Sequence, residues 1–495
     1  MSPRRFIWLA LVISGVVWFS SCSVGPNYRR PAIDTPAVFR SSTISHSLEL
    51  EWWQVYEDDT LQSLIREALT NNYDLRIAAA RVQEAQAVAM QARSQFVPNV
   101  NYGGTVSRGR NDLFGESFPN HGTVASSVSA TLNTFWEVDL WGRVRRLNES
   151  ARAEFFASEQ ARRGVRLSLL SDVATAYFQL LELDQEWEIT GETTNSFTES
   201  LNIFKQRMEG GTASALESSR AQAALDGAAA AVPQIREQIS NTENQLCILL
   251  GRNPGPIERP ALFLTRITLP AIPAGLPSTL LEHRPDIVEA EQQLRSANAQ
   301  IGVSVAQFFP TIGLTGFLGK VSPELSAFTL GGANAWGVAA EGTGPLFEGG
   351  RLVGQYRQSK AARDEAKLRY HQTILNAFRE VSDALVSREQ LAEIREWYAD
   401  EVEALKVAVK LSTERYVAGK ASYYEVLEAQ QQLFPAQLEL ARSQRDQLLA
   451  TVNLYKALGG GWHDDPASAS VSANVPIKAD GSSSETREAA IKTRQ

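Results

Sequence analysis

An internal duplication constrains this chain more than any other feature of its sequence. Segments 207–225 and 415–433 align without a gap at a constant shift of 208 residues. The same shift relates Val173 to Val381 and Gly251 to Gly459, so a whole helix–turn–helix unit occurs twice. The two units are alike and too elongated to be separate globules, so the sequence predicts one symmetric architecture. Identical pairs include Arg207/Arg415, Gly211/Gly419, Ser214/Ser422, Glu217/Glu425 and Gln222/Gln430.

Each copy is dominated by one very long helix. No proline interrupts 143–207, and about 65 helical residues would extend about 100 Å. Return helices of roughly half that length are expected at 214–250 and 422–458. A further helix is expected at 61–96, with a break near Asn71–Tyr73 and with Asp59 or Thr60 as its N-cap. Alternating spacings of three and four indicate coiled-coil seams, as in Leu170, Val173, Tyr177 and Leu180 and in Ile374, Phe378, Val381 and Leu385.

Before each long helix the apolar pattern changes to a period of two, which is typical of strands. The expected strands lie within 99–107, 127–133, 309–320 and 333–347, and a polar hairpin loop is expected at 108–122. Four strands are too few to close a barrel, and open strand edges are untenable in a bilayer. Several copies of the chain are therefore needed, two giving eight strands and three giving twelve. The apolar faces expected are Ile312, Leu314 and Leu318 on one strand and Trp336, Val338 and Ala340 on its partner.

The N-terminus reads as a bacterial export signal over residues 1–21, with Arg4 and Arg5 before an apolar run. Residues 19–22 resemble a lipoprotein processing site, with Phe19 where leucine is usual, which predicts a lipid on Cys22. The alternative is an ordinary signal cleaved nearby. We expect an extended segment at 22–60, repeats at 61–251 and 280–459, a proline-rich equatorial connector at 252–279, and a disordered or equatorial tail at 460–495.

The charge and the motifs argue against several functions. The chain has 48 basic and 56 acidic residues and no basic cluster, so nucleic acid is not an expected partner. The five histidines are scattered without ligand spacing, and the glycine-rich segments 342–347 and 349–354 match neither a dinucleotide fingerprint nor a phosphate loop. We therefore expect no enzyme activity, cofactor or metal.

Five motifs carry a resemblance to a known family: CSVGPNYRRP from Cys22, EWWQVYEDDTLQSLIREAL from Glu51, DLRIAAARVQEA from Asp74, GLPSTLLEHRPDIVEAE from Gly275 and RYVAGKASYYEVLEAQ from Arg415. Together they resemble the TolC-type outer-membrane channels, in the lipoprotein efflux branch typified by OprM and NodT-like proteins. His283 stands where the branch usually has arginine. The resemblance covers nearly the whole mature chain.

The resemblance implies an α+β membrane protein with an internal duplication, built mainly of long helices. It implies a homotrimer with a twelve-stranded barrel in the outer membrane, a periplasmic α-barrel and an equatorial girdle. The expected partners are the lipid bilayer, a periplasmic adaptor and an inner-membrane pump of the resistance-nodulation-division type. The channel would be a passive exit duct for small molecules.

Candidate site residues lie around the two helix reversals. Tight reversals account for the glycines there, and the resemblance adds contact with the adaptor. Glu425 and Glu428 share one helix face, and in three copies they would form carboxylate rings like the family's acidic periplasmic aperture. The alternative for both is a solvated helix face. The expected tip residues are Gly210, Gly211, Thr212, Ala213, Ser214, Ala418, Gly419, Lys420, Ala421 and Ser422, and the expected aperture residues are Tyr423, Tyr424, Glu425 and Glu428.

Two other functions remain compatible with parts of the pattern. A periplasmic coiled-coil adaptor or scaffold would share the export signal, the lipidated cysteine and the long heptads, but would lack the duplicated hairpins. A conduit for secreted polypeptides would share the channel, and the pore sequence does not separate it from a small-molecule duct.

Overall fold

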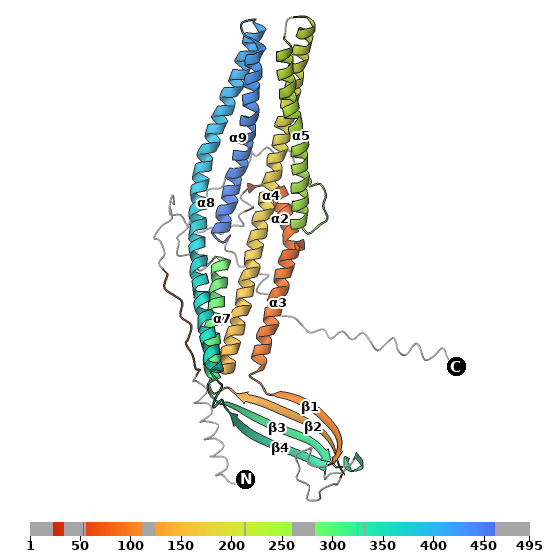
Figure 1. The fold of residues 1–495 in the computed structure, drawn as a ribbon, viewed down its shortest axis with the longest axis vertical. Helices are drawn as coiled ribbons and strands as arrows, with labels where there is room; N and C mark the ends of the chain where they lie inside the picture. Colours follow the sequence, from red (N-terminus) through yellow and green to blue (C-terminus); the bar gives the residue numbers. More distant parts are fainter. Residues whose placement is uncertain are drawn as a thin grey trace, which may run out of the picture.

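The computed structural model describes residues 23–33, 53, 56–110, 124–211, 214–259, 283–323, 325–329 and 333–460. The molecule is elongated, with a sheet at one end and two helical hairpins that reach the other end (Figure 1). Cys22, Thr212, Ala213, most of the connector and the tail after residue 460 lie outside the described residues.

The helices confirm the duplication at residue level. Helices α4 (Arg143–Glu209) and α8 (Arg351–Val417) have 67 residues each, and α5 (Ala215–Leu249) and α9 (Tyr423–Ala457) have 35 each. All four pairs of helix ends are related by the shift of 208. In the part of the chain that the structure describes, no helix combines the length and apolar character that a membrane crossing requires.

Shorter helices lie below the return helices α5 and α9 and complete the elongated helical part of the molecule, which we name the shaft. Helix α2 (Asp59–Asn71) precedes α3 (Tyr73–Ser94), and α7 (Pro285–Ala306) is the equivalent of α3. Asn72 forms the expected break, because its Oδ1 accepts from Leu75 N at 2.9 Å while its Nδ2 donates to Leu249 O at 2.9 Å. The end of α5 therefore meets the start of α3 alongside α4.

The N-cap of α2 is Asp58, so the prediction of Asp59 or Thr60 was wrong by one or two residues. Asp58 Oδ1 accepts from Thr60 N and Leu61 N at 2.9 and 3.0 Å. Its Oδ2 accepts from the Tyr177 hydroxyl of α4 at 2.7 Å. The hydrogen bond from Tyr177 thus decides which residue caps α2, and N-cap propensities along the sequence give no sign of this contact between distant segments.

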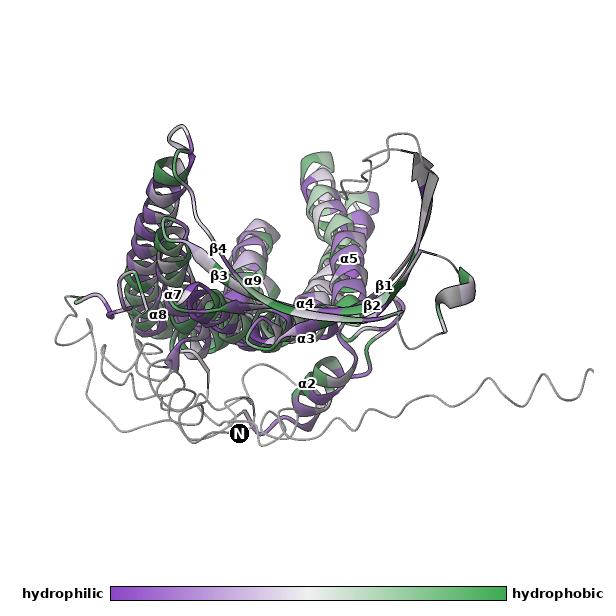
Figure 2. Cartoon of the chain, turned by 90° about the horizontal axis from the view of Figure 1, so that it is seen from below, coloured by the Kyte–Doolittle hydropathy of each residue, from purple (hydrophilic) through white to green (hydrophobic). Residues whose placement is uncertain are grey.

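The four strands form one antiparallel sheet in the order β1-β2-β3-β4. The strands are β1 (Asn99–Arg110), β2 (Val124–Val138), β3 (Thr311–Ser322) and β4 (Asn334–Thr343). The pairing of β2 with β3 joins the two repeats. Strand β1 runs through Arg110, so the first hairpin loop begins later than expected. Seen along the shaft, the sheet is an arc (Figure 2).

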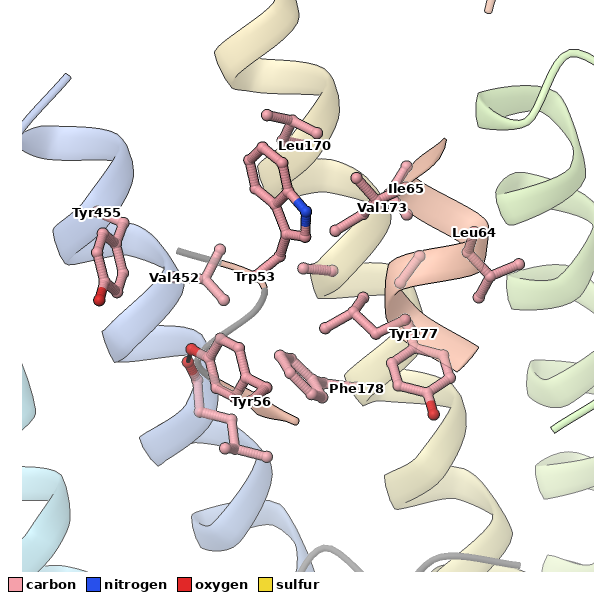
Figure 3. Close-up of a cluster of buried hydrophobic side chains, with 14 of the residues drawn as sticks. Trp53, Tyr56, Leu64, Ile65, Leu170, Val173, Tyr177, Phe178, Val452 and Tyr455 are labelled. Carbon is pink, nitrogen blue, oxygen red and sulfur yellow. Dashed lines mark hydrogen bonds between the residues drawn. The ribbon is translucent and has the colours of Figure 1, made fainter. Parts of the chain in front are cut away.

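The main hydrophobic core lies in the middle of the shaft, where α2, α4 and α9 meet (Figure 3). Tyr177 and Phe178 of α4 are fully buried there, Tyr56 packs on Phe178 with ring centroids 5.2 Å apart, and Tyr455 of α9 lies in the same cluster. Burial is the main cause that raises the pKa of the Tyr177 hydroxyl above its ordinary value, and its bond to Asp58 adds to the shift. This core fastens the first repeat to the second.

Candidate functional site

Two tight helix reversals form the end of the molecule farthest from the sheet (Figure 1). Gly211 and Gly419 have φ of 71° and 68°, a left-handed conformation that L side chains adopt only with strain. In the second turn, Gly419 N donates to Tyr416 O and Lys420 N to Arg415 O, each at 2.9 Å. These bonds satisfy the last carbonyls of α8, so the glycine is required for the reversal itself.

The repeated Ser-x-x-Glu motif acts differently in the two turns. In the first, Ser214 and Glu217 form a reciprocal capping box at the start of α5. In the second, Ser422 makes no side-chain cap, and the Glu425 carboxylate lies 3.4 Å from Arg415 Nε of α8. Glu217 thus stabilises the start of α5, whereas the equivalent Glu425 faces Arg415 and solvent.

The four expected aperture residues do not share one environment. Tyr424 and Glu425 are exposed, and so is Glu428. Tyr423 retains only 8% of its surface and faces α4. Among the described residues, no group of three or more His, Cys, Asp or Glu side chains is placed to hold a metal ion.

Tyr423 belongs to a polar contact between the two hairpins that we name the tip lock: Ser196, Ser200, Tyr423 and Gln430. Ser200 and Tyr423 oxygens lie 2.5 Å apart, and Gln430 Nε2 donates to Ser196 Oγ at 2.9 Å. Ser200 Oγ also donates to Ser196 O at 2.9 Å, which leaves the tyrosine hydroxyl as the donor to Ser200. Burial raises the pKa of the Tyr423 hydroxyl above its ordinary value.

Aromatic contacts reinforce the tip lock. Tyr423 meets Phe204 and Tyr416 edge to face, each at 4.8 Å between ring centroids. The Arg207 guanidinium lies 4.7 Å from the Tyr416 ring. Sequence reasoning missed Ser196 and Ser200; the available signal was two hydroxyls spaced four apart beside the apolar seam of α4.

The segment Ser23–Ile33, which we name the strap, runs over the junction of the sheet and the helices. Val24 N donates to Trp141 O at 3.0 Å, three residues after the end of β2. Arg146 is buried and donates to Asn27 Oδ1 at 2.7 Å and to the carbonyls of Val24 and Gly25 at 3.3 Å. Val24 therefore lies where the sheet ends and α4 begins.

Farther along, the strap is held on α7. The buried carboxylate of Glu291 accepts from the Tyr28 hydroxyl at 3.1 Å and from Arg30 at 2.5 Å. Burial is the main cause that raises the pKa of Tyr28 above its ordinary value, and the charge of Glu291 follows. A Cβ on Gly25 would lie 2.5 Å from Gly302 Cα, so the strap and α7 touch backbone to backbone.

The model of the outer membrane efflux proteins matches residues 64–252 and 276–460, one stretch in each half of the duplication. The chain belongs to the outer membrane efflux protein family. It is 36% identical over 478 residues to the toluene efflux pump outer membrane protein TtgC of Pseudomonas putida, covering 94% of this chain and 98% of the relative. It is 30% identical over 470 residues to the cation efflux system protein CusC of Escherichia coli, covering 93% and 100%. The solved outer-membrane channel OprN superposes with a TM-score of 0.83 at 29% identity, covering 89% and 100%.

These findings confirm the resemblance seen in the sequence. The protein is an outer-membrane channel of an efflux system, in a family of transporters and not of enzymes. The rival interpretation of a periplasmic adaptor or scaffold is wrong, because the sheet is present and the family match spans both repeats.

Proposed function

We propose that three copies of this efflux channel assemble into one duct that runs from the periplasm through the outer membrane. The observation that carries this proposal is the arc of four strands whose outer members, β1 and β4, each pair on one side only within the described sheet. An unpaired edge is not stable in hydrocarbon, so β1 of one copy would pair with β4 of the next. Three arcs of four strands give a closed barrel of twelve.

The two faces of the sheet support a barrel with lipid outside and water inside. The register aligns Tyr102, Leu132, Leu318 and Trp336 in one row across all four strands. These side chains are exposed by 91, 52, 63 and 74%. The next row, on the opposite face, consists of Asn101, Asn133, Phe317 and Gly337, so its first two members are polar amides. An apolar row on one face beside asparagines on the other fits a lipid-facing surface and an aqueous lumen.

The helices also carry apolar surface that a second copy would cover. On α8, Leu368, Leu375 and Trp397 are each exposed by two thirds or more, at 70, 68 and 67%. On α3, at the other edge of the protomer, Tyr73 and Met90 are exposed by 62 and 66%. Contact between these edges in neighbouring copies would close the helices into a cylinder that continues the barrel.

The hairpin α8/α9 is proposed to close the periplasmic end. Tyr424, Glu425 and Glu428 would line the aperture, where three copies bring carboxylates together and favour cations. Closure would come from packing, with the tip lock holding α9 against α4. The turns at Gly210–Ser214 and Ala418–Ser422 would contact a periplasmic adaptor, which would in turn connect the duct to an inner-membrane pump.

Small toxic compounds are the proposed cargo, since TtgC is named for toluene and CusC for cations. Export of polypeptides is the alternative. Susceptibility of a deletion strain to a panel of solvents, drugs and metal salts distinguishes them. A strain that tolerates the whole panel as well as its parent, yet fails to secrete a polypeptide, would favour the alternative.

A lipid on Cys22 is proposed as the membrane anchor. The strap supports it, because Ser23 lies against Gly142 at the boundary between sheet and helices, where a Cβ on Gly142 would come within 2.6 Å of Ser23 Oγ. An acyl chain on the preceding residue would start at the level of the inner leaflet and needs no long linker.

The assembly is tested on detergent-extracted full-length protein. We expect a protein mass of three chains and cation-conducting pores in planar bilayers. A stable, water-soluble monomer without pore activity would refute the proposed duct.

A further inference from the structure

A buried cluster of charges joins the two hairpins between the mid-shaft core and the tip lock. Glu182 and Glu186 lie one turn apart on α4 and are exposed by only 2 and 4%. Arg442 and Arg445 face them from α9. Along α4 the pair directly follows the core residues and precedes Phe197 of the tip cluster. Any movement of α9 away from α4 must therefore separate these four residues.

The contacts of the cluster are short. Arg445 Nη1 lies 3.1 Å from Glu182 Oε2, and Arg442 Nε lies 2.8 Å from Glu186 Oε1 and 4.0 Å from Glu182 Oε1. Each arginine also has an acidic partner on its own helix: Glu439 is 2.8 Å from Arg442, and Asp446 is 2.7 Å from Arg445. The two cations are thus shared among four carboxyl groups.

Two adjacent carboxyl groups withdrawn from water oppose double ionisation. Burial is the main cause that raises the pKa of Glu182 to about 8 from an ordinary 4.5, followed by the charge of Glu186 and a hydrogen bond to it; Arg445 and Arg442 act in the opposite direction. The packing of α9 against α4 therefore favours the protonated form of Glu182.

We propose that Glu182 and Glu186 form a proton latch between the hairpins: the closed seam keeps one proton on the pair, and opening exposes the pair to water and releases it. This inference rests on the proposed function, because it assigns regulation by periplasmic pH to the same movement of α8/α9.

The direction of the effect follows from linkage. Glu182 binds its proton more tightly in the closed state, so a closed chain carries more protons than an open one between pH 4.5 and about 8. The contribution of this bound proton to the stability of the closed state is complete below pH 4.5 and is lost as the pH rises toward 8. Each seam should become up to about tenfold easier to open for each pH unit in this window.

The test uses purified full-length trimer with two readouts. Infrared difference spectroscopy at pH 7 should show the carbonyl band of a protonated carboxylic acid, which Glu182→Gln removes. Open probability in planar bilayers should rise from pH 5 to 8 in the native channel, and Glu182→Gln should flatten this rise and keep the low opening seen at pH 5. Glu439→Gln is the matched control, because Glu439 is 44% exposed and pairs with Arg442 within α9, so its replacement should preserve both the band and the rise.

The outcomes are separable from those of the proposed function. A Glu182→Gln channel that keeps the native band, or keeps the native pH dependence, overturns the latch. The native protein could instead show no conductance at any pH but still show the carboxylic acid band, and Glu182→Gln could remove that band. In that case the protonated pair exists, and the proposed duct fails.

Discussion

Removing the Tyr423 hydroxyl tests whether the tip lock holds the channel closed. Tyr423→Phe deletes the bond to Ser200 and leaves the ring against Phe204 and Tyr416. A buried neutral hydrogen bond contributes about 1 kcal/mol net, so opening of one seam should become about fivefold easier. If the three hairpins of a trimer open together, the change is about 3 kcal/mol, or roughly 150-fold in the opening equilibrium.

Single-channel recording at constant pH measures this equilibrium, and a double-mutant cycle isolates the bond. Ser200→Ala leaves the Tyr423 hydroxyl buried without its acceptor, so it should open the channel at least as much as Tyr423→Phe. Adding Tyr423→Phe to Ser200→Ala should then have little further effect. Tyr424→Phe is the control: it keeps the exposed ring, whose face lies 5.1 Å from the Arg220 guanidinium, and it breaks no bond of the tip lock, so the opening equilibrium should match that of the native channel. Additive effects of the two lock substitutions, or no change in opening, would refute the reasoning.

The remaining predictions address the aperture, the barrel and the anchor. Glu425→Gln with Glu428→Gln should reduce cation selectivity in planar bilayers without preventing trimer assembly; unchanged selectivity and conductance would make the two residues a solvated helix face. Trp336→Arg, in the apolar row of the sheet, should destabilise the barrel by about 2–4 kcal/mol in a thermal melt of the trimer, whereas Asn101→Arg on the opposite face should cost much less. Mass spectrometry of the mature N-terminus should find an acylated Cys22, and an unmodified peptide that begins elsewhere would exclude the lipid but not the channel. Gly25→Val should displace the strap, because the new Cβ would meet Gly302 at 2.5 Å and the residue has a φ of 91°, and limited proteolysis by trypsin after Arg29 should become faster.

Local patterns determined the architecture of each repeat. The long heptad segments, the proline-free stretches and the period-two strands placed the helices within a few residues, since these signals depend on neighbours along the chain. The constant shift between the copies reappears in the ends of the four long helices. The glycines of the two turns could also be recognised in the sequence, because few residues other than glycine adopt the left-handed conformation.

The tertiary structure alone decided how equivalent residues are used. Glu217 and Glu425 occupy the same position of the repeat, yet one caps its helix and the other pairs with Arg415. Tyr423 looked like an aperture residue but faces α4, and its partner Ser200 lies 223 positions earlier in the chain. Glu182 reads as one more charged residue on a long helix until α9 buries it beside Arg445. Sequence period fixes which face of a helix a residue occupies, but whether that face meets water or another helix depends on contacts between distant segments, and these set the burial and charge on which the proposed gate depends.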